Sequence, residues 1–215
     1  MKYKGVIFDL DGTLVDTLAD LANAMNYGLE VLGEPTHSID ECRKMIGNGV
    51  SKFAERALSS DKQHLHGELL KLMKQRYLDN CFENSTLYDG IDETFDYLKE
   101  AGIQLGVVTK KDAGAARQIV EHFFGKGTFT AIVGVKDGKY LKPGPEGTLE
   151  IIKKMKLDKK QILLAGDSDV DIITAINAGV TAAGVSWGFR SRDELIEAGA
   201  KKIINHPSEI IELVT

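Results

Sequence analysis

Two carboxylates stand at the end of the first apolar stretch of the chain. Asp9 and Asp11 follow Val6-Ile7-Phe8 directly, and Gly12 and Thr13 come next. Residues i and i+2 of an extended segment point the same way, so both carboxylates are expected to emerge together at a strand end. Gly12 allows a sharp turn that brings backbone N–H groups toward a bound anion. Such a pair shares a proton or binds a hard cation, whereas an isolated pair of this kind is more often an acidic turn.

A second acidic segment follows another apolar stretch. Asp167 follows the run ILLA at 162–165 after one glycine, and Asp169 and Asp171 lie where a helix is expected to begin. Carboxylates in the first turn of a helix ordinarily cap it and interact with its dipole. Capping accounts for Asp169, leaves the role of Asp171 open between capping and a functional site, and does not account for Asp167.

Two further residues are suited to holding a phosphate. Thr109 ends the apolar stretch LGVVT and can donate a hydrogen bond to a phosphate oxygen. Lys142 precedes Pro143 and offers a compact positive charge. Separately, a threonine at a strand end and a lysine at the surface are both common.

Together these residues predict one catalytic site. Asp9, Asp11 and Asp167 would concentrate negative charge, which Mg²⁺ would neutralise. A carboxylate that attacks a phosphate must overcome the repulsion between two anions, and Lys142 and the metal would supply the opposing charge. Thr109 would position the phosphoryl oxygens.

The elements that must position these residues follow a regular alternation. Short β-prone runs alternate with helix-length amphipathic stretches along most of the chain. The runs lie at 6–8, 103–108, 131–135, 162–165, 181–185 and 201–205, and the stretches at 91–101, 112–123, 145–156, 169–178 and 191–198. This pattern predicts an α/β fold with a Rossmann-like parallel sheet covered on both faces. Such sheets bind ligands at the carboxyl ends of their strands, where the acidic residues, Thr109 and Lys142 are expected.

One region departs from the alternation. Residues 16–82 contain helical patterns and no convincing strand. They predict an all-helical domain inserted after the first strand, with 1–15 and 83–215 forming the α/β core. We expect this insertion to lie over the active-site end of the sheet.

Composition excludes several classes of function. The net charge of −5 argues against a general binder of nucleic acid or of anionic membranes, which would need a basic face. No run approaches the roughly 20 apolar residues of a membrane-spanning helix, and Asp9 interrupts an N-terminal run too short for a signal peptide. Cys42 and Cys81 show no metal-ligand spacing, and Trp187 and Gly188-Phe189 are interpreted as packing near a loop. The expectation is a cytoplasmic protein with no nucleic-acid or membrane partner; the sequence makes no prediction of oligomeric state.

The motifs, taken in order, resemble those of a known superfamily. DxDGTxxDT at 9–17, Thr109, KPxP at 142–145 and GDSxxD at 166–171 are similar to the four motifs of the haloacid dehalogenase superfamily, over nearly the whole chain. The helical insertion resembles that superfamily's cap domain. Less specific stretches resemble its phosphoglycolate phosphatase branch, namely MIGNGV at 45–50, ERAL at 55–58, LYDGI at 87–91 and WGFRSRDEL at 187–195.

The resemblance implies a phosphoric monoester hydrolase that uses Mg²⁺ and acts on a small, phosphoglycolate-like substrate. Asp9 would be the nucleophile, forming an aspartyl-phosphate, and a metal ligand. Asp11 would act as general acid and then base, with its backbone carbonyl on the metal. Asp167 would be a further metal ligand, and Asp171 a partner of the ligands.

Thr109 and Lys142 would hold the phosphate, by the same resemblance. One position departs from the branch, which usually has Thr-Asn-Lys where this chain has Thr109-Lys110-Lys111. Lys110 either alters substrate preference or points to solvent. The turn Gly47-Asn48-Gly49 in the insertion is expected to face the core and to contribute to selectivity, because the motifs hold only the phosphoryl group and the metal.

Other functions remain as alternatives. A sugar phosphomutase of the β-phosphoglucomutase type typically carries a histidine where this chain has Leu21, and a pyrophosphatase or nucleotidase would use the same motifs. A dehalogenase would lack the second acid, Asp11. A response-regulator receiver, which is a signalling module, is shorter and accepts phosphate after a later strand.

Overall fold

The structure, a computed structural model, describes residues 2–46 and 49–215, and its chain divides into two units. The core unit comprises Met1–Val15 and Leu87–Thr215, and the helical unit comprises Asp16–Thr86. The chain passes between them twice, through β2 (Val15–Asp16) and β3 (Thr86–Leu87), which pair as a two-stranded sheet.

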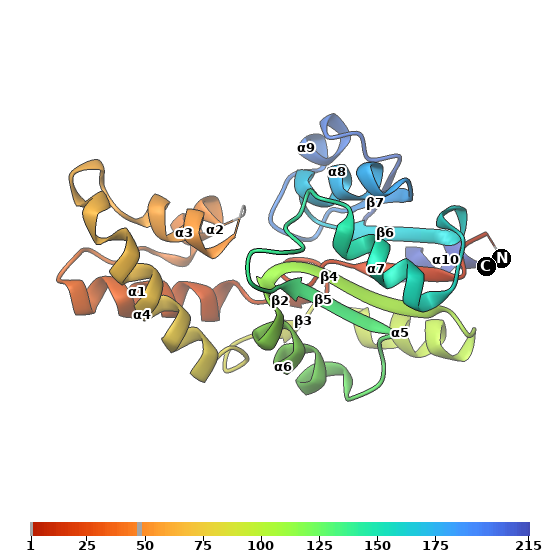
Figure 1. The fold of residues 1–215 in the computed structure, drawn as a ribbon, viewed down its shortest axis with the longest axis horizontal. Helices are drawn as coiled ribbons and strands as arrows, with labels where there is room; N and C mark the ends of the chain where they lie inside the picture. The colour runs from red at the N-terminus through yellow and green to blue at the C-terminus, as the bar shows by residue number, and fades with distance from the viewer. Residues whose placement is uncertain (1, 47–48) are drawn as a thin grey trace. The chain divides into compact units, whose positions relative to one another are not determined.

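A six-stranded parallel sheet forms the centre of the core unit (Figure 1). Its strands are β1 (Gly5–Phe8), β4 (Gln104–Asp112), β5 (Ala131–Val135), β6 (Ile162–Gly166), β7 (Thr181–Val185) and β8 (Lys202–Ile204). They run in the order β5-β4-β1-β6-β7-β8. Phe8 lies opposite Val107 of β4 and Ala165 of β6, so β1 occupies a central position. The prediction of an α/β fold with a parallel sheet is confirmed.

Helices cover both faces of this sheet. They are α5 (Ile91–Glu100), α6 (Ala113–Phe124), α7 (Glu146–Met155), α8 (Asp169–Ala178), α9 (Arg192–Glu197) and α10 (Glu209–Val214); a short 3-10 turn, η2, spans Lys159–Gln161. Ile7 points into an aliphatic layer with Ile151 of α7 and Ile172 of α8. Phe8 points the other way and packs against Phe95 of α5, with the two rings tilted and their centroids 5.1 Å apart. Ile7 and Phe8 lie on opposite faces of the sheet because successive side chains of a strand point to alternate sides.

The helical unit has its own small core. It contains α1 (Leu18–Leu32), α2 (Ile39–Met45), α3 (Val50–Ala57), the 3-10 helix η1 (Ser60–Leu65) and α4 (His66–Asp79). Helix α1 packs mainly on α4. Gly28 lets them approach closely, because a Cβ there would lie 2.7 Å from Cδ1 of Leu69.

The helical unit extends to Thr86, beyond the expected end of the insertion at residue 82. The buried carboxylate of Asp20, in the first turn of α1, accepts hydrogen bonds from the backbone and side chain of Asn84 and from the Ser85 hydroxyl. These contacts tie residues 84 and 85 to α1.

Among residues 2–46 and 49–215, no helix is long and apolar enough to cross a membrane.

Candidate active site

Three neighbouring strands bring the predicted residues to the same edge of the sheet. Asp9 follows β1, Asp167 follows β6, and Thr109 lies toward the carboxyl end of β4. The backbone N–H of Asp9 donates to the carbonyl oxygen of Ala165 at 2.9 Å, which extends the pairing of β1 with β6 up to the nucleophile candidate.

A buried carboxylate cluster occupies this edge. Carboxylate oxygens of Asp9, Asp167 and Asp171 lie within 4.8 Å of one another. The ammonium of Lys142, whose side chain is 2% exposed, lies 2.9 Å from Oδ1 of Asp9 and also donates to Oδ1 of Asp171. Lys142 comes from the segment between β5 and α7 and precedes a cis peptide bond to Pro143. Two of the three buried carboxylates thus contact the same lysine.

The electrostatics of the cluster follow from burial. Burial, followed by the charge of Asp171, raises the pKa of Asp9 to about 7, although Lys142 acts in the opposite direction. Burial also raises the pKa of Asp167 well above its ordinary value, and the charges of Asp171 and Asp9 add to the effect. Burial alone would lower the pKa of Lys142, but Asp171 and Asp9 outweigh it and raise that pKa. Three buried oxygen donors with too little positive charge fit a hard divalent cation such as Mg²⁺.

Asp11 lies beside this cluster. Its Oδ1 is 3.0 Å from the ammonium of Lys111, a side chain that is only 6% exposed. Asp11 is not among the clustered carboxylates, where Asp171 stands with Asp9 and Asp167. A contribution of Asp11 to the metal through its backbone carbonyl stays a prediction.

Thr109 and Lys110 flank the cluster on β4. Thr109 is buried, and its Oγ1 accepts a hydrogen bond from the backbone N–H of Lys111 at 3.2 Å, which leaves the hydroxyl hydrogen to donate. Lys110 is half-buried, and burial and the charge of Lys142 lower its pKa, against the pull of Asp171 and Asp9. Lys110 is therefore close enough to act electrostatically on the cluster.

Asp171 has both of the roles that the sequence left open, helix capping and a contact within the candidate site. Its Oδ2 accepts hydrogen bonds from the N–H and the hydroxyl of Ser168, which closes a capping box at the start of α8. Its Oδ1 binds Lys142. One carboxylate thus caps the helix and holds the lysine that faces Asp9.

Comparison with known proteins agrees with this geometry. Residues 6–185 match the family model of haloacid dehalogenase-like hydrolases. The chain belongs to this family.

Individual relatives in the family extend the similarity over the whole chain. Phosphoglycolate phosphatase of Mesorhizobium japonicum is 33% identical, over 94% of this chain and 90% of the relative. That of Pasteurella multocida is 30% identical, over 99% of each. A solved structure from Lactobacillus delbrueckii subsp. bulgaricus superposes with a TM-score of 0.91 at 31% identity, covering 100% of this chain and 99% of the other. The prediction of a hydrolase of this family, similar to phosphoglycolate phosphatases, is confirmed at the level of family and enzyme class.

Phe189 contacts the cluster directly and lies outside the four haloacid dehalogenase motifs, whereas Thr13, a second direct contact, lies within the first motif. The backbone N–H of Phe189 donates to Oδ2 of Asp167 at 2.8 Å, and the Thr13 hydroxyl donates to Oδ1 at 3.1 Å. The indole N–H of Trp187 donates to the carbonyl oxygen of Thr13 at 3.0 Å. The interpretation of Trp187 and Phe189 as loop packing missed these bonds. Their position just after the apolar run at 181–185 was the signal available in the sequence, whereas the place of β7 beside β6 is seen only in the folded sheet.

The turn expected to govern selectivity is described only in part. Gly47 and Asn48 lie outside the described residues. Gly49 precedes α3 with φ of 89°, a left-handed value that favours glycine.

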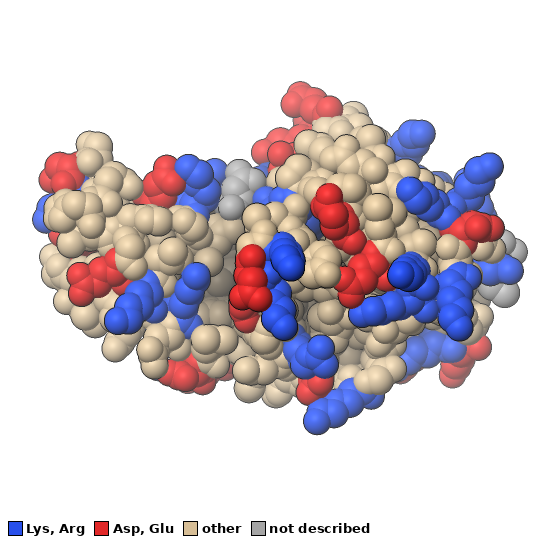
Figure 2. Space-filling view, viewed as in Figure 1, with Lys and Arg blue, Asp and Glu red and all other residues tan. Residues whose placement is uncertain are grey.

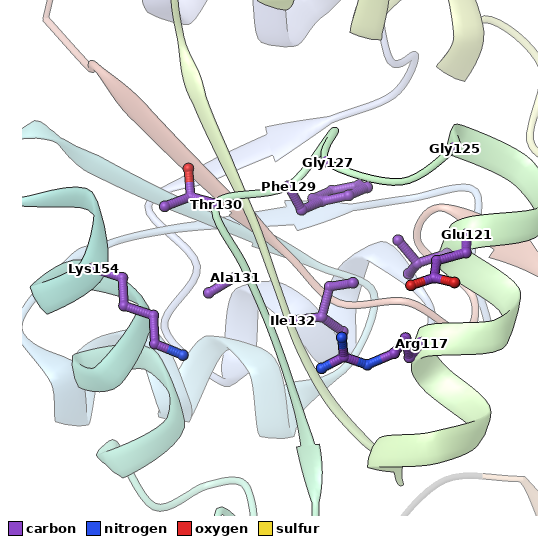
Figure 3. A pocket seen from close by; sticks show the side chains of 10 residues that line it. Arg117, Glu121, Gly125, Gly127, Phe129, Thr130, Ala131, Ile132 and Lys154 are labelled. Atoms are coloured by element: carbon purple, nitrogen blue, oxygen red, sulfur yellow. The ribbon is translucent and has the colours of Figure 1, made fainter.

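A hollow of about 210 Å³ lies elsewhere in the core unit, beside the edge strand β5 (Figure 3). Arg117 of α6 and Lys154 of α7 extend toward this strand from opposite sides. Charged side chains beside an edge strand discourage pairing with another chain. We interpret the hollow as a protected sheet edge.

Proposed function

We propose that the protein is a Mg²⁺-dependent phosphatase that hydrolyses a small phosphorylated metabolite, similar to phosphoglycolate, through an aspartyl-phosphate on Asp9. The observation that carries this proposal is the buried cluster of Asp9, Asp167 and Asp171 around Lys142 at the carboxyl ends of β1 and β6. The activity in the names of the relatives supports the substrate class.

Asp9 is oriented for attack. Its Oδ1 is held by Lys142 at 2.9 Å and by the backbone N–H of Leu10 at 2.7 Å. This leaves Oδ2 as the oxygen that attacks phosphorus. The bond between phosphorus and the ester oxygen then breaks, and Asp11 donates a proton to the departing oxygen.

Hydrolysis of the aspartyl-phosphate completes the cycle. Asp11 takes a proton from water, whose oxygen attacks phosphorus, and the bond to Asp9 breaks to release inorganic phosphate. Lys142 and the Thr109 hydroxyl stabilise the charge on the phosphoryl oxygens during both steps. A Mg²⁺ ion held by Asp9 and Asp167, with the backbone carbonyl of Asp11, would offset the repulsion between carboxylate and phosphate.

A second substrate class is favoured by one observation. Lys110 adds a half-buried positive charge beside the cluster, where the branch usually has asparagine. A substrate whose leaving group carries more negative charge than the single carboxylate of phosphoglycolate, such as pyrophosphate, would benefit most from that charge.

The acidic and basic side chains elsewhere do not suggest a polyanion as substrate. On the face drawn in Figure 2, the described Lys and Arg side chains are interspersed with Asp and Glu. This distribution is typical of a solvated surface.

Phosphate release by the purified protein tests the proposal. We expect turnover of phosphoglycolate, a sugar phosphate or pyrophosphate in Mg²⁺ and loss of turnover in excess EDTA. Ca²⁺ should inhibit, because it takes more ligands at longer distances than Mg²⁺ and would displace the attacking carboxylate. Full activity in EDTA would contradict a metal-assisted mechanism.

A further inference from the structure

The loop that follows β7 reaches back to the loop that follows β1. Residues 187–189, the 187–189 loop, hold Asp167 in two ways. Phe189 donates its backbone N–H to Oδ2 of Asp167 at 2.8 Å. Trp187 donates its indole N–H to the carbonyl oxygen of Thr13 at 3.0 Å, and the Thr13 hydroxyl donates to Oδ1 of Asp167 at 3.1 Å. Each oxygen of this carboxylate is therefore fixed by a different loop.

Close packing reinforces these hydrogen bonds. A Cβ at Gly188 would lie 2.2 Å from Cβ of Asp167 and 2.3 Å from the carbonyl oxygen of Gly12. Gly12 has φ of 82°, and a Cβ there would lie 2.4 Å from Oδ2 of Asp167. Only hydrogen fits at either glycine without displacing the carboxylate or the facing loop. The two loops and Asp167 thus form one tightly packed arrangement.

We propose that the 187–189 loop positions the carboxylate of Asp167 for the divalent cation. The inference rests on the proposed function, because the cation belongs to that mechanism. Trp187 is a positioning residue, since it acts through Thr13 and does not touch the metal site itself. Each carboxylate oxygen retains a lone pair beyond the one that accepts the hydrogen bond. Loss of such outer contacts typically weakens metal binding by about 10- to 100-fold.

The chain provides its own reporter for this arrangement. Trp187 is its single tryptophan, and its indole is bonded to the loop that carries Asp9 and Thr13. A cation bound at Asp167 will therefore change the environment of the only indole. We expect Mg²⁺ to change the intrinsic fluorescence of the wild-type protein.

Calorimetric titration with Mg²⁺ alone, in the absence of substrate, tests the proposal. Trp187→Phe keeps an aromatic ring and removes the N–H donor, so the Kd for Mg²⁺ should rise about 10-fold. The matched control is Ser186→Ala, which removes an exposed hydrogen bond of 3.1 Å to Asn205 at the residue that precedes the 187–189 loop. Its Kd should equal that of wild type. Melting curves of the metal-free proteins establish that each variant is folded.

The outcomes separate this inference from the proposed function. If wild type binds Mg²⁺ and folded Trp187→Phe binds it equally well, the positioning role is overturned and the proposed function stands. A lower Tm of Trp187→Phe with an unchanged Kd would indicate a merely structural role and has the same consequence. If wild type binds no Mg²⁺, both proposals fail. If Trp187→Phe does not fold, the fluorescence of the wild-type protein during titration with Mg²⁺ decides. The midpoint of the fluorescence change must then match the calorimetric Kd. A fluorescence that does not change with Mg²⁺ overturns the inference.

Discussion

Lys142 carries a positive charge that two of the buried carboxylates share directly. Its ammonium contacts Asp9 and Asp171 at once, and its side chain is almost fully buried. Replacing such a charge leaves uncompensated carboxylates in a low-dielectric environment, which is costly. Asp171 in turn is held by Ser168 at the start of α8, so the helix end fixes the lysine that orients Asp9.

Lys110 gives a prediction about substrate preference. Lys110→Asn restores the residue usual in the phosphoglycolate phosphatase branch and removes a charge beside the cluster. We expect the ratio of kcat/KM for pyrophosphate to that for phosphoglycolate to fall about 5-fold, which corresponds to about 1 kcal/mol for a partly screened charge. Steady-state kinetics on both substrates provides the measurement.

The control for Lys110 is an exposed lysine at the other end of the strands. Lys201 immediately precedes β8 and is exposed. Lys201→Asn should leave the ratio unchanged. An equal ratio in Lys110→Asn and wild type would show that Lys110 does not select the substrate.

Most elements of the core could be predicted because their signals are local. The run at 131–135 and the helix at 169–178 match β5 and α8 residue for residue. Strand β4 continues past the predicted end of its run, to Asp112, after a register shift that pairs Asp112 with Val135. Asp112 then caps α6 by accepting from the backbone N–H of Gly114. Such a shift depends on the neighbouring strand and leaves no pattern in β4 itself.

The candidate site was predictable where a motif marks a strand end. Asp9 and Asp167 follow apolar runs, and adjacent strands bring them together. The bond from Trp187 to Thr13 joins residues 174 positions apart, and it depends on the order of β6 and β7 in the sheet. Local periodicity carries no information about such a contact.

Within the helical unit, Asp20 gives a prediction about stability. Its buried carboxylate accepts bonds from Asn84 and from Ser85, the latter at 2.6 Å. Asp20→Ala leaves these donors without their acceptor, and the unfolding free energy of this unit should fall by about 2–3 kcal/mol. Hydrogen–deuterium exchange should become faster in α1 and α4.

Glu30→Ala is the matched control for Asp20, since Glu30 lies exposed on the same helix. Exposed substitutions of this kind usually change stability by less than about 0.5 kcal/mol. Exchange in β1 and β6 should be unaffected by either variant. If hydrogen–deuterium exchange in α1 is the same in Asp20→Ala and wild type, Asp20 does not stabilise this unit.

At the scale of the whole molecule, each of the two units has its own core. The core unit contains the complete cluster of Asp9, Asp167, Asp171 and Lys142. In the proposed mechanism these residues act only on the phosphoryl group, which all phosphate esters share. Discrimination among esters therefore requires further contacts, and a role of the helical unit as the cap that provides them stays a prediction.

The turn Gly47-Asn48-Gly49 carries the corresponding prediction. Asn48→Ala should change the relative kcat/KM for phosphoglycolate and a sugar phosphate by about 3-fold or more. It should affect p-nitrophenyl phosphate less, because that activated ester depends less on contacts outside the phosphoryl group. Equal proportional losses on all three substrates, or no loss, would show that this turn does not set specificity.

Covalent capture of the intermediate tests the central claim most directly. The protein is mixed with phosphoglycolate, or with the best substrate found, and Mg²⁺, then quenched, reduced with borohydride and mapped by peptide mass spectrometry. An aspartyl-phosphate is reduced to homoserine, whereas a free carboxylate is not. We predict homoserine at position 9 in wild type, none in Asp9→Asn, and loss of turnover by several orders of magnitude in that variant. Phosphate release with no modification at Asp9, or near wild-type turnover by Asp9→Asn, would contradict Asp9 as the nucleophile.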